Sequence, residues 1–301
     1  MSTSVSLADM PPRDMVASRA RARRRYLVDR IVRALCIAAT AIGLLCLASI
    51  LATLVWRGFA ALDLSTFVRD FRPTTYGDPE AEMGGLYHAI IGSLIQTAIG
   101  VALGTPIGIL VGTYLSEYAR QSAMGNAVRF VSDVLLSAPS ILIGLFIYQI
   151  VVLPMGGFSG IAGALALAII VIPVVVRTTE DMLSLIPNTL REAVVALGAP
   201  KWKMITLVAY RAALSGIVTG ILLAVARVAG ETAPLLLTSF GNNITSTDLT
   251  KAMSSLPIAI YQQANSGFPD LIEIAWAGAL IVTMGVLAIN ILARLLLRRS
   301  K

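Results

Sequence analysis

Six long apolar runs divide this chain, and they constrain its fold more than any other feature. They lie at about residues 32–55, 86–115, 128–153, 158–182, 212–238 and 271–297. Each is long enough to cross about 30 Å of hydrocarbon as a helix that rises 1.5 Å per residue. Only 14% of the residues are charged, against about a quarter in soluble domains. The chain is therefore predicted to be an all-α, polytopic membrane protein with about six transmembrane helices.

The basic residues predict how these helices are oriented. With the N-terminus inside, the inner segments carry 17 Lys and Arg residues and the outer segments carry four. Because cytoplasmic loops hold the excess of such residues, both termini are predicted to be cytoplasmic. The expected domains are a basic tail (1–31), a transmembrane domain (32–297) with a cytoplasmic loop (183–211), and a short tail (298–301). Since no single face gathers this charge, we expect a lipid membrane as partner and no nucleic acid.

The residues expected of an enzyme or a metal site are missing from the sequence. It has one histidine, His88, and its two cysteines, Cys36 and Cys46, lie ten residues apart in the first apolar run. No lysine follows a glycine, so the GxxxxGK[ST] phosphate loop of ATPases is absent. We therefore expect no catalytic residue, no metal and no cofactor, and ATP would have to be hydrolysed by another chain.

The predicted loop after the fourth run contains two short helices separated by Gly198. Glycine suits the turn between them, and Pro200 suits the first turn of the second helix. Val194 and Val195 lie near the charged Glu192, which gives the first helix an amphipathic surface. Such a segment could bind a partner protein, or it could lie on the membrane surface.

Arg227 and Glu231 lie inside the fifth apolar run. A charged residue at the bilayer centre costs about 2.5–3.5 kcal/mol on insertion scales, so neither is expected to face lipid. Four residues apart, they would share one helix face and could pair. They could be a structural ion pair. Alternatively, they could form an anion passage in which arginine donates to an oxyanion and the carboxylate orients it or competes with it.

Arg177 lies near the end of the fourth run, three residues before Glu180 and on the same predicted face. Its position near the cytoplasmic interface would let its side chain reach water. It could otherwise be a second charged station on the path of an anion. In the last outer segment, a short helix is expected near residues 253–263.

The loop with Glu192-Ala193 and Gly198 resembles the EAA loop of ABC importer permeases, a family in which this loop docks onto the ATPase subunit. The proline that ends the family pattern is missing at residues 208–211, so the entry into the fifth helix is expected to bend differently. With this loop, residues 84–86, 173–183 and 226–235 resemble the PstA family, the permease subunits of phosphate-specific ABC importers. The likeness covers about residues 84–297.

The resemblance implies an ABC importer permease (MetI-like) bundle in a bacterial plasma (inner) membrane that takes up inorganic phosphate. It implies three kinds of protein partner: an ATPase dimer, a second related permease subunit and an extracytoplasmic phosphate-binding protein. It also assigns residues to the phosphate path and to ATPase coupling. The path residues are Arg177, Arg227 and Glu231, and the coupling residues are Glu192, Ala193 and Gly198. Arginine suits the path because it stays protonated when buried.

Three other functions remain open from the residues alone. The chain could be an ABC permease for another oxyanion, such as sulfate or molybdate. It could be a secondary anion transporter driven by an ion gradient, in which the Glu192–Gly198 loop would have no docking role. It could also be a membrane scaffold, in which case replacing Arg227 would lower its abundance and leave specific transport unaffected.

Overall fold

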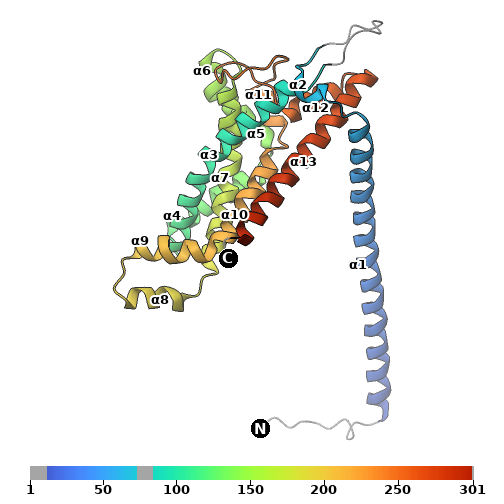
Figure 1. The fold of residues 1–301 in the computed structure, drawn as a ribbon. Coiled ribbons are helices and arrows are strands. Elements are labelled where there is room, and N and C mark those ends of the chain that lie inside the picture. The colour runs from blue at the N-terminus through green and yellow to red at the C-terminus, as the bar shows by residue number, and fades with distance from the viewer. Residues whose placement is uncertain (1–11, 73–83, 300–301) are drawn as a thin grey trace. The chain divides into compact units, whose positions relative to one another are not determined.

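The computed structural model describes residues 12–72 and 84–299, and over these ranges its regular structure is entirely helical (Figure 1). It divides into two units, residues 1–55 and 56–301. The predicted tails, 1–31 and 298–301, lie partly outside the described residues. The prediction of an all-α membrane protein is confirmed.

The first unit consists of helix α1 (Pro12–Ala60), which runs on past Val55 into the second unit. Its 49 residues correspond to about 74 Å at 1.5 Å per residue, about two and a half times the 30 Å of hydrocarbon that a span must cross. The helix therefore begins well before the first apolar run, inside the segment predicted as a tail. An exposed ion pair between Arg33 and Asp29, 3.0 Å apart, lies where this extension meets the first apolar run.

In the second unit, the second, fourth and sixth apolar runs each form a continuous helical span, whereas the helix of the fifth run ends at Val228 and does not continue to residue 238 as predicted. Among the described residues, five helices are long and apolar enough to cross a membrane, Arg23–Ala60 included, or six if one bent pair counts as a span. The spans of the second unit are α3 (Tyr87–Glu117), α7 (Gly160–Ser184), the segment Lys201–Val228, and α13 (Pro269–Arg299). The segment Lys201–Val228 comprises α9 (Lys201–Lys203), the π-helical turn η3 (Met204–Ala209) and α10 (Tyr210–Val228).

The third apolar run is broken, which corrects the prediction of one continuous helix. Its two halves, Ala123–Ser137 and Ser140–Met155, are bent by 103°. The break falls at Pro139, which has no backbone N–H to continue the helix and which keeps Ala138 extended. The elements of this run are α4 (Ala123–Ser137), α5 (Ser140–Ile147), η2 (Tyr148–Val152) and α6 (Leu153–Met155).

The core of the second unit is the close pair α3 and α7. Glycines recur at every fourth position of α3, at residues 100, 104, 108 and 112. A Cβ atom on Gly108 would lie only 2.6 Å from the Cβ of Val175 on α7. In membranes, small residues at this spacing let two helix backbones approach closely. The pair forms a continuous scaffold between the two ends of the unit.

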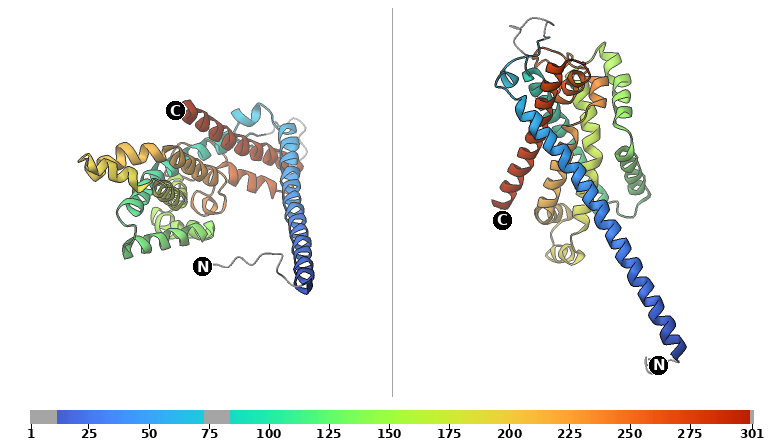
Figure 2. Two further views of the ribbon diagram at one scale, coloured as in Figure 1. Left: turned by 90° about the horizontal axis from the view of Figure 1, so that it is seen from below. Right: turned by 90° about the vertical axis from the view of Figure 1, so that its right-hand side faces the viewer.

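One end of the unit, which we call the loop end, carries α8 (Asn188–Ala196) and α9 (Figures 1 and 2). The break between them is Gly198, with a φ of 73°. The two predicted helices are confirmed, but the second is not separate, because it continues through η3 into α10. This is how the chain enters the fifth span without the family's proline.

The opposite, far end carries α2 (Ser65–Val68), α12 (Leu256–Ala264) and the polar segment 239–255 (Figure 1). Side chains of α3 hold this segment: Gln96 Nε2 donates to the carbonyl oxygen of Ser254 at 3.0 Å, and Ser93 Oγ accepts from the N–H of Leu256 at 2.7 Å. The helix predicted near residues 253–263 is confirmed as α12. The far end is therefore an ordered layer attached to the same helix that reaches the loop end.

Candidate functional site

The fifth span is interrupted at its charged residues. Helix α10 ends at Val228, and α11 (Ala233–Thr238) begins only after Glu231. Arg227 Nε lies 4.0 Å from Glu231 Oε1, with 38% of the arginine side chain and 16% of the glutamate side chain exposed. The two residues do not share one helix face as predicted, because the helix ends between them. They nevertheless approach each other across the turn.

This interruption constrains what can surround it. Backbone N–H and C=O groups without helical partners are tolerated at membrane depth only where they are buried in protein or line a water-filled cavity. Beyond the gap, α11 packs against α5, where a Cβ atom on Gly144 would come within 2.6 Å of the Cα of Pro234. The turn at Gly230 therefore marks a protein-lined or water-lined position in the membrane.

Arg177 lies on α7 and pairs with two carboxylates. Its Nε is 3.4 Å from Asp181 Oδ2, and its Nη1 is 3.8 Å from Asp133 Oδ1 on α4, with all three side chains about half exposed. Glu180, predicted on the same face, instead accepts a hydrogen bond from Arg129 Nε at 2.7 Å. The carboxylates around Arg177 thus come from two helices.

Helix packing places the two arginines at different depths. On α10, a Cβ atom at Gly220 would lie 2.4 Å from Thr178 Oγ1, so Gly220 is level with the residue beside Arg177. Arg227 is seven residues beyond Gly220, or about 10 Å along the helix toward the far end. Arg177 therefore lies nearer the loop end than Arg227, and the two arginines do not share one position along the bundle.

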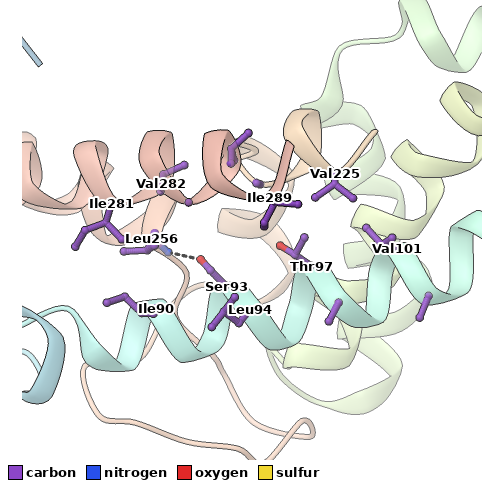
Figure 3. Close-up of a pocket in the computed structure, with 15 residues that line it drawn as sticks. Ile90, Ser93, Leu94, Thr97, Val101, Val225, Leu256, Ile281, Val282 and Ile289 are labelled. Atoms are coloured by element: carbon purple, nitrogen blue, oxygen red, sulfur yellow. Dashed lines mark hydrogen bonds between the residues drawn. The ribbon is translucent and has the colours of Figure 1, made fainter. Parts of the chain in front are cut away.

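A separate groove of about 530 Å³ lies between α3, α10 and α13 (Figure 3). Aliphatic side chains such as Ile90, Val101 and Ile289 line it, and no charged residue is among its lining residues. Figure 3 shows the bond from the Leu256 N–H to Ser93 at its wall. Because a desolvated anion needs donors in place of water, this groove is not an anion site.

The predicted coupling residues Glu192, Ala193 and Gly198 are all exposed at the loop end. Large apolar side chains surround them, with Leu197 85% exposed and Trp202 59% exposed. No residue of α8 is buried. An apolar patch of this kind, rimmed by charges, is typical of a protein interaction site.

A buried ion pair that the sequence did not predict attaches α8 to the bundle. Arg191 Nη2 donates to Glu117 Oε1 at 2.7 Å, and only 13% and 4% of the two side chains are exposed. The same guanidinium donates to the carbonyl oxygens of Leu183 and Ile186, both at 2.7 Å. A cation at the last carbonyls of α7 is also favoured by the helix dipole. Arg191 therefore joins α8 to the loop-end termini of both core helices.

The other side of the Gly198 turn is attached to the same place. Lys201 Nζ donates to the carbonyl oxygen of Glu117 and lies 4.2 Å from the centre of the Tyr118 ring. The sequence contained one sign of this attachment, namely the carboxylate of Glu117 directly after a long run without Asp, Glu, Lys or Arg. A glutamate at a helix C-terminus is unfavourable without a nearby cation, but its partner is 74 residues away.

Comparison with known proteins agrees with this architecture. Residues 104–301 match the family described as "Binding-protein-dependent transport system inner membrane component". The phosphate transport system permease protein PstA of Pasteurella multocida is 52% identical over 90% of this chain and 95% of its own length. The protein of the same name from Yersinia pestis is 46% identical over 91% of each chain. PstA 1 of Mycobacterium tuberculosis is 36% identical over 98% of this chain and 96% of its own.

Solved structures of ABC transporters share the fold. A chain of the MetNI methionine ABC transporter, in an inward-facing conformation, aligns with a TM-score of 0.58 at 18% identity, over 72% of this chain and 94% of its own. A chain of a bacterial alginate importer aligns with a TM-score of 0.64 at 15% identity, over 93% and 99%. Both alignments support the MetI-like bundle, and the sequence relatives decide the family. This chain belongs to the inner-membrane components of binding-protein-dependent transport systems and, within them, to the PstA permease family.

Proposed function

We propose that this chain is a permease subunit of an ATP-driven importer of inorganic phosphate and that it forms half of the translocation path. The observation that carries the proposal is the charged interruption of the fifth span at Arg227 and Glu231. Phosphate carries one or two negative charges, so crossing a membrane requires fixed donors that replace its water shell. An arginine at the interruption of a span, in a member of the PstA permease family, supplies such donors.

The two arginines act in sequence. Phosphate enters from the far end, which is extracytoplasmic in the proposed orientation, and accepts hydrogen bonds from Arg227. Glu231, only loosely paired at 4.0 Å, competes for the same guanidinium and so keeps the binding weak enough for release. Phosphate then reaches Arg177, about 10 Å closer to the cytoplasm, where Asp133 and Asp181 compete in the same way.

The partners follow from the surfaces of the chain. The exposed loop with Glu192, Ala193 and Gly198 docks onto a dimer of ATPase subunits, which supply the hydrolysis that this chain has no motif for. A second, related permease completes the path, and a phosphate-binding protein delivers the ion to the far end. Both termini are cytoplasmic in this arrangement.

The test is uptake of labelled phosphate into vesicles that hold the complete complex, with and without internal ATP. Arg227→Ala should lower ATP-dependent uptake by about 10- to 100-fold, since hydrogen bonds to charged groups contribute about 1.5–3 kcal/mol. The matched control is Arg211→Ala, an exposed arginine on the first turn of the same helix. Normal uptake by an assembled Arg227→Ala complex would refute the proposed path.

Two further arms separate the rival functions. Uptake that does not depend on ATP would indicate a secondary transporter. Uptake of phosphate that sulfate or molybdate abolishes at equal concentration would indicate a different oxyanion as the natural substrate.

A further inference from the structure

A second cationic site lies at the loop end, away from the proposed path. A pocket of about 370 Å³ opens between the end of α3 and the loop that carries α8 and α9. It is lined by Ser116, Glu117 and Arg120 on one side and by Arg191, Val195 and Lys201 on the other. Its volume falls within the range of about 300–1,000 Å³ that is usual for small-molecule sites.

The charges around this pocket favour an anion. Arg120, Arg191 and Lys201 bring three positive charges, and Glu117 is the one carboxylate in the lining. Glu117 is already paired with Arg191 at 2.7 Å. Within the described residues, Arg120 has neither an ion-pair nor a hydrogen-bond partner, and its side chain is exposed. A net positive charge is therefore left for a ligand.

Two buried donors in the lining also lack a partner. Ser116 is 3% exposed, and its Oγ has no hydrogen-bond partner among the described residues. Arginine has five N–H donors. Four of those of Arg191 are used, by Glu117, Leu183, Ile186 and Asn188, while its buried Nε has no partner in the part of the chain that the structure describes. Buried polar groups are nearly always hydrogen-bonded, so these donors indicate a missing acceptor.

We propose that this pocket binds a phosphate group, as free inorganic phosphate or as a lipid headgroup, from the cytoplasmic side of the proposed orientation. A phosphate has several acceptor oxygens that arginine and lysine bind with charge-assisted hydrogen bonds. The ligand contacts Arg120 on the α3 side and Lys201 beyond the Gly198 turn. It thereby bridges the core helix and the loop.

The binding itself does not depend on the proposed transport function, but its consequence does. A phosphate in the pocket restrains α8 and α9 against α3. If the loop transmits ATP hydrolysis to the path, phosphate that accumulates in the cytoplasm slows further import at this point.

The experiment measures amide hydrogen exchange over residues 188–203. The sample is the complete complex in phosphatidylcholine nanodiscs without ATP. Inorganic phosphate is added in place of chloride, so that the ionic strength stays constant. Phosphate should slow this exchange in the wild type. Arg120→Ala should raise the phosphate concentration needed by more than tenfold, and Arg120→Lys should restore most of the response. Arg211→Ala is the matched control and should respond like the wild type.

Arg227→Ala separates this site from the proposed path, since it should lose transport and keep the slowed exchange. Discs that contain phosphatidylglycerol test the lipid source: slowing that depends on Arg120 and needs no added phosphate assigns the group to a headgroup. No response in the wild type, or an unchanged response in Arg120→Ala, overturns the site. Slow exchange that ignores phosphate and disappears only without the ATPase also overturns it, because the ATPase then fills the pocket.

Discussion

Removing the carboxylate of Glu117 tests whether the buried pair with Arg191 holds the loop that we propose to dock onto the ATPase. Glu117→Gln keeps the shape of the side chain and removes its charge. Breaking a buried ion pair costs about 3–5 kcal/mol, because the remaining charge is left unpaired. Arg191 keeps its bonds to the carbonyl oxygens of Leu183 and Ile186, so we expect the lower limit, about 3 kcal/mol. This corresponds to a roughly hundredfold shift in the equilibrium for opening the loop.

The assay is amide hydrogen exchange over residues 185–196, together with the number of ATP molecules hydrolysed for each phosphate transported. Both should rise in Glu117→Gln, since a detached loop no longer moves the bundle. A double-mutant cycle with Arg191→Met isolates the pair, and we expect a coupling energy of about 1.5–3 kcal/mol.

The control is Asp29→Asn, which breaks the exposed pair with Arg33 on α1. Exposed pairs contribute at most about 1 kcal/mol, so exchange over residues 185–196 should not change. If the effects of Glu117→Gln and Arg191→Met instead add within about 0.5 kcal/mol, the two side chains do not act together and the reasoning fails.

Three further outcomes are expected. Gly198→Val should raise the ATP hydrolysed per phosphate transported, because a β-branched residue at a φ of 73° is strained by about 1–3 kcal/mol. Gly198→Asn should leave this ratio unchanged, because asparagine tolerates the left-handed conformation. Gly108→Leu should lower the melting temperature of the complex, because its Cβ would meet Val175 at 2.6 Å. A melting assay that does not depend on labelling of cysteines can compare it with Gly285→Ala, because Gly285 has open space around it. Partial burial raises the pKa of Asp70, but hydrogen bonds from Thr245 outweigh it and lower the pKa below its ordinary value. The protection of amides 239–255 against hydrogen exchange, corrected for the intrinsic pH dependence of exchange, should therefore be lost as the pH falls through that lowered pKa. Asp70→Asn should remove this pH dependence.

The sequence was sufficient where a property belongs to one segment. Hydrophobic length predicted the spans, because a helix in lipid satisfies its own backbone and needs only an apolar surface. The turn at Gly198 was predictable for the same reason, since a left-handed φ depends on the residue itself. The family resemblance rested on residues 84–86, 173–183, 187–203 and 226–235, and the relatives confirmed it.

The effect of a proline on a helix cannot be predicted from the local sequence alone. Pro106 and Pro173 lie inside α3 and α7, which remain continuous, whereas the third run bends by 103° at Pro139. All three lack a backbone N–H, so the residue type cannot separate these outcomes. The difference lies in what packs around each helix: α3 and α7 support each other along their glycine contact.

The sequence by itself determined that the chain spans a membrane, that its apolar runs are largely helical, and which of these runs contain charged residues. Only the tertiary structure decided the partners of those charges. Glu180 pairs with Arg129 rather than with Arg177, and Glu117 pairs with Arg191, which is 74 residues away in the sequence. The tertiary structure also separated Arg177 from Arg227 by about two turns of helix. The physical reason is that periodicity reports the solvent a segment prefers, whereas an ion pair depends on where two segments meet.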